Sequence, residues 1–250
     1  MTYLAIVSIV RKKWEGTFNQ TLVQMFLEKM DYEQNQSEHL AVEIQKLKTR
    51  NIYVDLVRDF IHRPVCEPLF STQYGIQEEE WPQMYLLPFQ CTIEVKLRVF
   101  QFKILHNILY TNERLFKMKQ VATKCCTFCE TSVETPVHLF YDCKVAEDLR
   151  RAFVAKIGVN LSVTYEDLTR KRIMFGFIKD WKGPHKILLN HLILLLKRYI
   201  YIQRCKKSLA SLVGLTAFIC KIRHVELVIA KQKQKENIHY RKWSPVENVF

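Results

Sequence analysis

Four cysteines and one histidine lie within nineteen residues, in the stretch CCTFCETSVETPVHLFYDC that runs from Cys125 to Cys143. Cys126, Cys129, His138 and Cys143 have the spacing C-x2-C-x8-H-x4-C. Zinc prefers four tetrahedral sulfur or nitrogen ligands, and a C-x2-C turn places two thiolates on one ion while a later pair closes the shell. Because three thiolates and one imidazole leave no position for water, this pattern predicts a structural zinc site and not a catalytic one.

The second pair of ligands needs a particular local backbone. Thr135 and Pro136 have the N-cap and N1 chemistry that would begin a helical turn carrying His138. His138 and Cys143 are five residues apart, which is about 140° around an α-helix, so the turn must end or loosen before Cys143. The eight residues before His138 are too few for the helix of a ββα finger, so we expect a compact knuckle.

Cys125 allows a second register, because Cys125-x3-Cys129 is also an allowed pairing. We prefer Cys126, since two intervening residues form the commonest turn, and we leave Cys125 as a spare or exchangeable thiol. Three weaker interpretations are buried thiols without a metal, a redox Cys-x-x-Cys pair, and a nucleophilic cysteine with His138 as its base. The redox pair lacks a surrounding βαβ pattern, and the nucleophile requires residues that are free of metal. A zinc deaminase is also excluded, because in deaminases the histidine precedes the cysteines, whereas here it follows Cys126 and Cys129.

Composition predicts a helical fold. The chain has 250 residues, of which only six are glycine and seven are proline, and its Leu-, Ile-, Lys- and Glu-rich runs favour helix. The expected fold class is mainly α, an irregular helical assembly with one small zinc-knuckle loop. We expect three parts: a helical N-terminal segment at 1–80, a helix plus zinc-binding domain at 81–157, and a basic helical C-terminal segment at 158–250.

The individual helices follow from apolar periodicity. In residues 92–118, Ile93, Leu97, Phe100, Ile104 and Ile108 form one apolar stripe. The segment 78–91 contains two prolines and reads as a connector whose aromatic residues Trp81, Tyr85 and Phe89 pack into a neighbour. Helices are expected at 3–31, 37–62, 92–118, 144–157, 165–177, 184–206 and 209–240.

The expected location is nuclear or cytoplasmic. No apolar run reaches the length of a membrane span, and the basic cluster near the start lies on the wrong side for a signal peptide, so no membrane association is expected. Thiols stay reduced in these compartments, which favours a metal site over disulfides. The cysteines outside the cluster, Cys66, Cys91, Cys205 and Cys220, read as buried apolar residues.

Positive charge is concentrated in the second half of the chain. Residues 144–250 contain 22 Lys and Arg against 8 Asp and Glu, a net charge of +14, whereas residues 1–143 contain 16 against 17, a net charge of −1. This asymmetry favours a polyanion as partner, with RNA or DNA ahead of an acidic membrane surface, and a solvated basic surface is the alternative. The candidate nucleic-acid contacts are Lys96, Lys103, Arg150, Arg151, Lys197, Arg198, Lys206, Lys207, Lys231, Lys233 and Lys235.

Four segments in order resemble a known family. WPQMYLLPF, KLRVFQFKILHNILYTNERLFKM, CTFCETSVETPVHLFYDC and NHLILLLKRYIYIQRC look like the region downstream of the polymerase domain in non-LTR (LINE-type) retrotransposon reverse transcriptases. The cysteine unit is similar to their zinc-binding domain. The resemblance implies a zinc-stabilised part that helps hold template RNA and target DNA, with Cys126, Cys129, His138 and Cys143 as ligands. This chain departs from the family in its cysteine doublet and in Glu130, which stands where the family often has a glycine and which is expected to strain the turn.

Polymerase chemistry is not expected. Polymerases of this kind hold two metal ions on adjacent aspartates, and no Asp-Asp occurs in the chain. The sequence YVDL at Tyr53–Leu56 resembles the palm motif but lacks the second carboxylate, and no endonuclease set is clustered. We therefore expect a non-catalytic, zinc-stabilised nucleic-acid-binding C-terminal fragment of a retrotransposon reverse transcriptase, with RNA or DNA as partner and a polymerase domain as a further candidate. The alternative is a helical protein–protein docking or scaffold module with a structural zinc.

Overall fold

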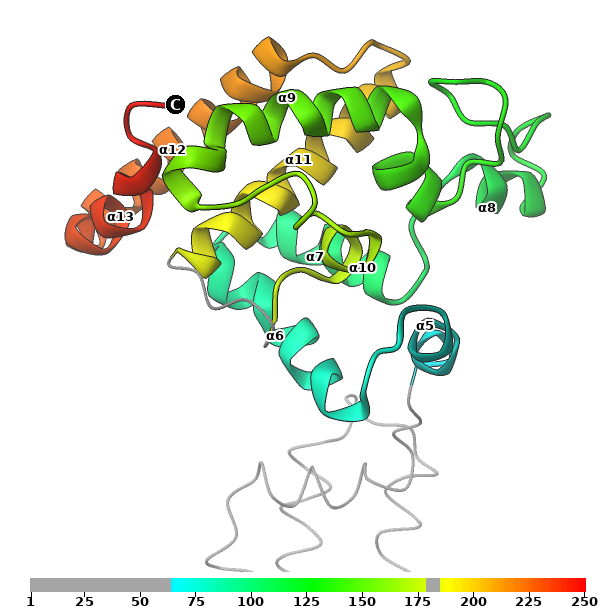
Figure 1. The fold of residues 1–250 in the computed structure, drawn as a ribbon, viewed down its shortest axis with the longest axis horizontal. Coiled ribbons are helices and arrows are strands. Elements are labelled where there is room, and N and C mark those ends of the chain that lie inside the picture. Colours follow the sequence, from blue (N-terminus) through cyan, green and yellow to red (C-terminus); the bar gives the residue numbers. More distant parts are fainter. Residues whose placement is uncertain (1–63, 179–184) are drawn as a thin grey trace, which may run out of the picture. The chain divides into compact units, whose positions relative to one another are not determined.

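Helices make up most of the part of the chain that the structure, a computed structural model, describes: residues 64–178 and 185–250 (Figure 1). Within these ranges no β-strand occurs, and the sole strand-like pairing is an isolated antiparallel bridge between Cys125 and Val133. The expected mainly α fold class is confirmed. The helices expected at 3–31 and 37–62 and the YVDL motif lie outside the described residues.

The helical elements follow one another with short connections, except for the loop that carries the cysteine cluster. They are α5 (Cys66–Tyr74), a 3₁₀ turn (Glu78–Glu80), α6 (Trp81–Cys91), α7 (Val95–Leu105), α8 (Asn112–Lys117), a π-helix (His138–Asp142), α9 (Lys144–Leu161), α10 (Arg170–Phe175), α11 (Lys186–Lys206), α12 (Leu212–Gln232), α13 (Glu236–Trp243) and a 3₁₀ turn (Ser244–Val246). None of the described helices is both long enough and apolar enough to cross a membrane.

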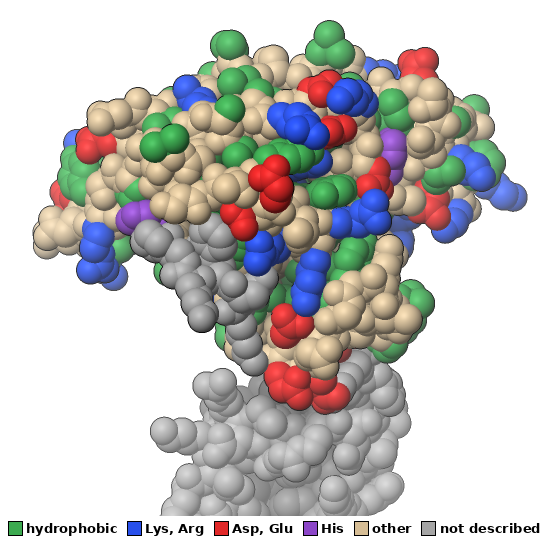
Figure 2. Space-filling model, in the orientation of Figure 1, with side chains coloured by type: hydrophobic (Ala, Val, Ile, Leu, Met, Phe, Trp, Pro, Cys, Tyr) green, Lys and Arg blue, Asp and Glu red, His purple; other side chains and the backbone are tan. Residues whose placement is uncertain are grey.

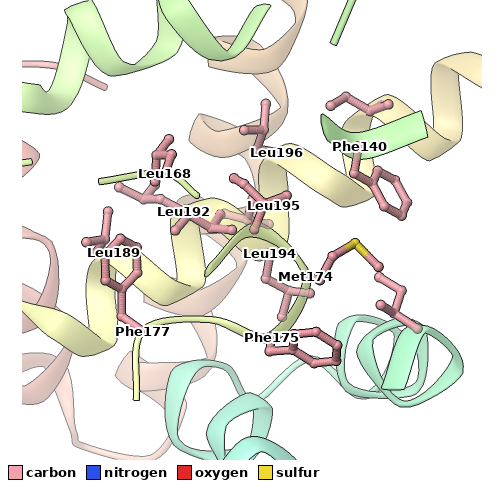
Figure 3. Close-up of a cluster of buried hydrophobic side chains, with 14 of the residues drawn as sticks. Phe140, Leu168, Met174, Phe175, Phe177, Leu189, Leu192, Leu194, Leu195 and Leu196 are labelled. Atoms are coloured by element: carbon pink, nitrogen blue, oxygen red, sulfur yellow. The ribbon is translucent and has the colours of Figure 1, made fainter. Parts of the chain in front are cut away.

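Helix α11 forms the centre of the hydrophobic core. Every residue from 188 to 197 is buried, and α6, α7, α12 and α13 all pack against this helix (Figure 1). Figure 3 shows its leucines meeting Phe140 of the π-helix and the aromatic residues Phe175 and Phe177 at the end of α10. One cluster of buried residues extends from Cys66 to Val246, so it crosses the domain boundaries expected at 80/81 and 157/158.

Two helices expected from periodicity are each broken by a left-handed residue. The 92–118 helix divides into α7 and α8 because Asn107 has φ 51°, and the amide of Ile108 closes the end of α7 on the carbonyl of Lys103 at 2.8 Å. The 209–240 helix divides into α12 and α13 because Gln234 has φ 53°, and the amide of Lys235 bonds the carbonyl of Ala230 at 2.8 Å. Neither break contains the glycine or proline that normally marks a helix end in sequence.

The expected connector at 78–91 is instead helix α6. Pro82 lies in the first turn, where the missing amide hydrogen has no intrahelical partner, so this proline is compatible with a helix start. Pro88 lies inside the helix. Trp81 is buried as expected, whereas Phe89 is 61% exposed. Helix α9 is longer than the expected 144–157, α10 is shorter than 165–177, and α11 agrees with 184–206 within two residues.

Candidate metal centre

The structure brings four predicted metal ligands together. The ligand atoms of Cys126, Cys129, His138 and Cys143 all lie within 4.8 Å of one another, and the sulfur of Cys125 is not part of this group. The Cys126 and Cys143 sulfurs are 3.9 Å apart, and Cys129 Sγ lies 3.3 Å from His138 Nε2. Two thiolates bound to one tetrahedral zinc at ~2.3 Å each would be about 3.8 Å apart, so the donor set and its spacing fit this ion.

A tight backbone turn positions the first two cysteines. The amide of Cys126 bonds the carbonyl of Ser132 at 2.8 Å, and the amide of Glu130 bonds the carbonyl of Cys126 at 2.9 Å. The turn also directs the amide of Phe128 toward Cys126 Sγ at 3.4 Å. Glu130 has φ 58°, so it adopts the left-handed conformation that side chains disfavour, and the strain expected at this turn is present.

A π-helix positions the second pair. The Thr135 hydroxyl accepts a hydrogen bond from the amide of His138 at 3.0 Å, so Thr135 begins the turn as predicted. The turn then widens, because the amide of Cys143 bonds the carbonyl of His138, five residues earlier, at 2.8 Å. In a helix with this wider bonding pattern, residues five apart lie nearer the same side than they would in an α-helix. The expected loosening before Cys143 is therefore present, and it takes the form of a π-helix.

Hydrogen bonds within the cluster favour ionised sulfur at two positions. The Cys126 thiol lowers the pKa of Cys143, and the same contact raises the pKa of Cys126. Partial burial opposes ionisation of Cys129, but hydrogen bonds from the Thr131 hydroxyl and the nearby backbone lower the pKa of its thiol. Thiolate is the form that binds metal, so these contacts favour the ligating form of Cys129 and Cys143 and disfavour that of Cys126.

Glu134 connects the cysteine loop to two helices. This fully buried carboxylate accepts hydrogen bonds from the amide of Asn112 at 2.8 Å and from the amide and hydroxyl of Thr127 at 2.8 and 2.9 Å. It also pairs with the buried Arg204, whose Nε and Nη2 lie 2.9 and 2.7 Å away, and Arg204 Nη2 donates to Asn112 as well. The cysteine loop, the start of α8 and the end of α11 thus share one carboxylate. Sequence reasoning missed Glu134, because its partners at 112 and 204 are too distant in the chain to leave a local signal.

The comparisons with known proteins concern this same part of the chain. Residues 70–149 match the family model described as zinc-binding in reverse transcriptase. The matched segment extends from α5 into α9 and includes the four clustered ligands and Glu134. It is therefore similar to a reverse transcriptase zinc-binding region, which the sequence resemblance implied. No curated protein and no solved structure matches the chain.

Two of the cations predicted to contact nucleic acid are buried, which corrects their assignment. Arg150 is 1% exposed and donates to the carbonyls of Phe140 and Tyr141 at 3.0 and 2.8 Å, so it stabilises the π-helix of the zinc-binding region. Lys197 is 2% exposed and donates to Gln101 Oε1 at 2.7 Å, and burial lowers its pKa to about 7. Helical periodicity contained a signal for Arg150, since it continues the buried face of α9 between Ala146 and Phe153.

The exposed face of α9 carries both signs of charge. Figure 2 shows Lys and Arg side chains among Asp and Glu side chains on this face of the molecule. Arg151 donates to Glu147 at 2.8 Å, and Lys144 pairs with Asp148 at 3.0 Å. Arg151, a predicted nucleic-acid contact, is therefore exposed but already has an acidic partner.

Three other predicted cations come together from α7 and α11. Arg198 lies over the Phe100 ring at 5.3 Å, and the Phe100 and Tyr201 rings are 5.5 Å apart. The Tyr201 hydroxyl donates to the carbonyl of Tyr110 at 3.1 Å, and Lys103 Nζ lies 5.8 Å from the centre of the Tyr110 ring. Lys96 lies two helical turns before Lys103 on the same side of α7. We call this surface the α7–α11 strip; it consists of Lys96, Lys103, Tyr110, Arg198 and Tyr201. Glu94 lies near its Lys96 end, where burial raises the pKa of the Glu94 carboxyl and the charges of Arg198 and Lys96 oppose that rise.

The remaining predicted cations are exposed near the ends of helices. Lys206 and Lys207 end α11, beside the Arg204 that binds Glu134, while Lys231, Lys233 and Lys235 surround the break between α12 and α13. Among the cysteines outside the cluster, Cys66 and Cys91 are buried as expected. The prediction was wrong for Cys205, which is exposed because it lies on the solvent side of the last turn of α11, and Cys220 is half-buried.

Proposed function

We propose that this chain is a non-catalytic, zinc-stabilised nucleic-acid-binding part of a non-LTR retrotransposon reverse transcriptase. The observation that carries this proposal is the Cys₃His cluster inside a segment similar to a reverse transcriptase zinc-binding region. Four protein ligands fill a tetrahedral shell, so a bound zinc would stabilise the loop and would have no open position for substrate. The lack of adjacent aspartates in the chain supports a role without polymerase chemistry.

The nucleic-acid part of the proposal is supported by the α7–α11 strip. Residues that are about 100 positions apart in sequence, Lys103 and Arg198, contribute positive charge to one surface that also exposes tyrosine. Clustered cations beside aromatic rings are the chemistry that binds a phosphate backbone and unpaired bases. Residues 92–124 alone contain seven Lys and Arg and two Glu, which the near-neutral charge of residues 1–143 had concealed.

Metal analysis of freshly purified protein tests the zinc part. We expect one zinc per chain and loss of order in the cysteine loop after chelation, because metal ligation contributes about 10–16 kcal/mol in small zinc peptides. Cys126→Ser should lower zinc affinity strongly, whereas the matched control Cys125→Ser should change it little, since the Cys125 sulfur is outside the cluster. Protein purified without zinc, or a larger effect for Cys125→Ser, would contradict the assignment.

A salt titration of RNA and DNA binding tests the nucleic-acid part. Each phosphate contact contributes about 0.7–0.9 to the slope of log affinity against log salt, so Lys96→Gln and Lys103→Gln should each reduce the slope by that amount. Lys144→Gln is the control, because Lys144 is exposed but already pairs with Glu147 and Asp148 on α9. Replacing Lys231, Lys233 and Lys235 together by Gln measures the separate contribution of the α12–α13 break. Slopes that no variant changes would exclude the electrostatic account.

A docking module is the second candidate, and one observation favours it. Helices α6 and α7 and the link between them expose several large apolar side chains to solvent: Leu86, Phe89, Ile93, Val95, Val99 and Phe102. Most of the apolar stripe that suggested this function in the sequence is not available to a partner, because Leu97, Phe100 and Ile104 pack into the core of this chain. Binding of a polymerase domain through the exposed residues would change little with salt, in contrast to binding through phosphate contacts.

A further inference from the structure

Tyr110 is an exposed aromatic residue on an anchored backbone. Its side chain is 46% exposed, yet both neighbours in the chain, Leu109 and Thr111, are buried. The amide of Thr111 bonds the carbonyl of Leu109 at 3.0 Å, and the Tyr201 hydroxyl bonds the carbonyl of Tyr110 at 3.1 Å. The backbone that carries this ring is therefore held in place by the surrounding structure, although the ring itself contributes little to the core.

The cysteine loop adds a second anchor two residues later. The Asn112 amide bonds Glu134 at 2.8 Å, and the Asn112 side chain donates to the carbonyl of Cys125 at 2.7 Å and to the Thr127 hydroxyl at 3.1 Å. The segment between α7 and α8 is thus attached to the cysteine loop on one side and to α11 on the other. A backbone anchored in this way loses little conformational entropy when the aromatic ring that it carries binds a ligand.

The charges around Tyr110 indicate what kind of ligand fits. Lys103 Nζ lies over its ring, 5.8 Å from the centre, so a base would stack on the opposite face of the ring. Arg198 lies over the Phe100 ring, further along the strip, and the Phe100 ring neighbours Tyr201. A base presents a flat π-face and its flanking phosphates carry negative charge, so an exposed aromatic ring on a strip that also carries cations matches one nucleotide and its neighbours. Bases in a duplex are stacked on each other and leave no free face, so the match is to a single strand.

We propose that Tyr110 is a stacking site for an unpaired base of single-stranded nucleic acid, with Lys103 and Arg198 holding the flanking phosphates. Tyr201 acts as a positioning residue, because its hydroxyl holds the backbone of Tyr110. This inference rests on the proposed nucleic-acid-binding function, and it adds to that function the strand state of the ligand and the residue that contacts a base.

The test compares Tyr110→Ala with Tyr110→Phe in the full chain loaded with zinc. The probes are 12-mers of oligo(U) and oligo(dT), a blunt duplex of the same length, and a 12-mer backbone without bases. Stacking on an aromatic side chain is worth ~1–3 kcal/mol per base, so Tyr110→Ala should weaken single-strand binding about 5- to 150-fold. Tyr110→Phe keeps the ring and should bind like the unchanged protein, and a thermal melt of each variant verifies the fold.

Three further readings make the outcome decisive. Tyr110→Ala should leave duplex affinity, affinity for the base-free backbone and the salt slope unchanged, whereas Lys103→Gln should reduce the slope. If the unchanged protein binds none of the probes, the proposed function fails. If it binds them but Tyr110→Ala binds single strands as tightly, or loses duplex affinity to the same extent, the stacking site is refuted while nucleic-acid binding stands. The affinities for oligo(U) and oligo(dT) show whether RNA or DNA is the preferred single strand.

Discussion

Replacing Glu134 by Gln should destabilise the described part of the chain severely. The substitution keeps the shape of the side chain but removes the charge that faces Arg204 at 2.7 Å in a buried site. It also turns one acceptor into a donor group, while the Thr127 amide and hydroxyl and the Asn112 amide still need acceptors. Removing one partner of a buried ion pair costs about 3–5 kcal/mol, because the other charge is left uncompensated.

Thermal unfolding of the zinc-loaded protein, followed by circular dichroism, measures this effect. A loss of 3–5 kcal/mol corresponds to a decrease of roughly 6–20 °C in Tm for a unit of about 190 residues. The matched control is Glu113→Gln, since Glu113 pairs with Lys117 at the same distance of 2.7 Å but on the surface of α8. An exposed pair contributes about 0–1 kcal/mol, so the control should lower Tm by no more than about 4 °C. Equal shifts for the two variants would refute the role assigned to Glu134.

Two further predictions concern strained and buried residues. Glu130→Gly should raise the free energy of unfolding by about 1 kcal/mol, because glycine adopts the left-handed conformation without steric cost. Chemical denaturation measures the gain, and Glu130→Ala, which keeps the strain, should show none. Burial lowers the pKa of Lys197 to about 7, whereas a lysine in the unfolded state has a pKa of about 10.4. Above about pH 7 the folded state therefore binds fewer protons than the unfolded state, and stability should rise with pH. Between about pH 7.5 and 8.5 the free energy of unfolding should rise by up to about 1.4 kcal/mol per pH unit from this residue, and Lys197→Met should remove that rise. An equal rise in the unchanged protein and the variant would show that the buried amine is charged.

The candidate metal site was predictable because its information is local. Cys126, Cys129, His138 and Cys143 lie within eighteen residues, and the C-x2-C turn and the N-cap at Thr135 restrict the backbone between them. The required loosening before Cys143 followed from helix geometry alone, although its form as a π-helix did not. The mainly α fold class was equally accessible, because composition and apolar periodicity act over the whole chain.

Helix ends and buried cations were harder to predict, for two physical reasons. Asn107 and Gln234 end their helices in a left-handed conformation. Asparagine is only a weak signal for such an end, and the apolar residues Ile108 and Leu109 continue past it, whereas glutamine is no signal at all. Arg150 and Lys197 were predicted to be surface cations because counting charged residues along the chain gives no information on burial. Their burial depends on carbonyl acceptors that the fold brings near: those of Phe140 and Tyr141 for Arg150, and that of Met174 for Lys197.

The ion pair between Glu134 and Arg204 limits the order in which contacts can form while the chain is being synthesised. The last clustered ligand is Cys143 and the ionic partner of Glu134 is Arg204, so the ribosome adds 61 residues between the two. At ~5–20 residues per second, the ribosome needs roughly 3–12 s to produce that stretch. During this time the set of four clustered ligands is complete, but the carboxylate of Glu134 still lacks its ionic partner. The metal ligands are therefore all present before the loop can pack on α11, because that contact needs Arg204.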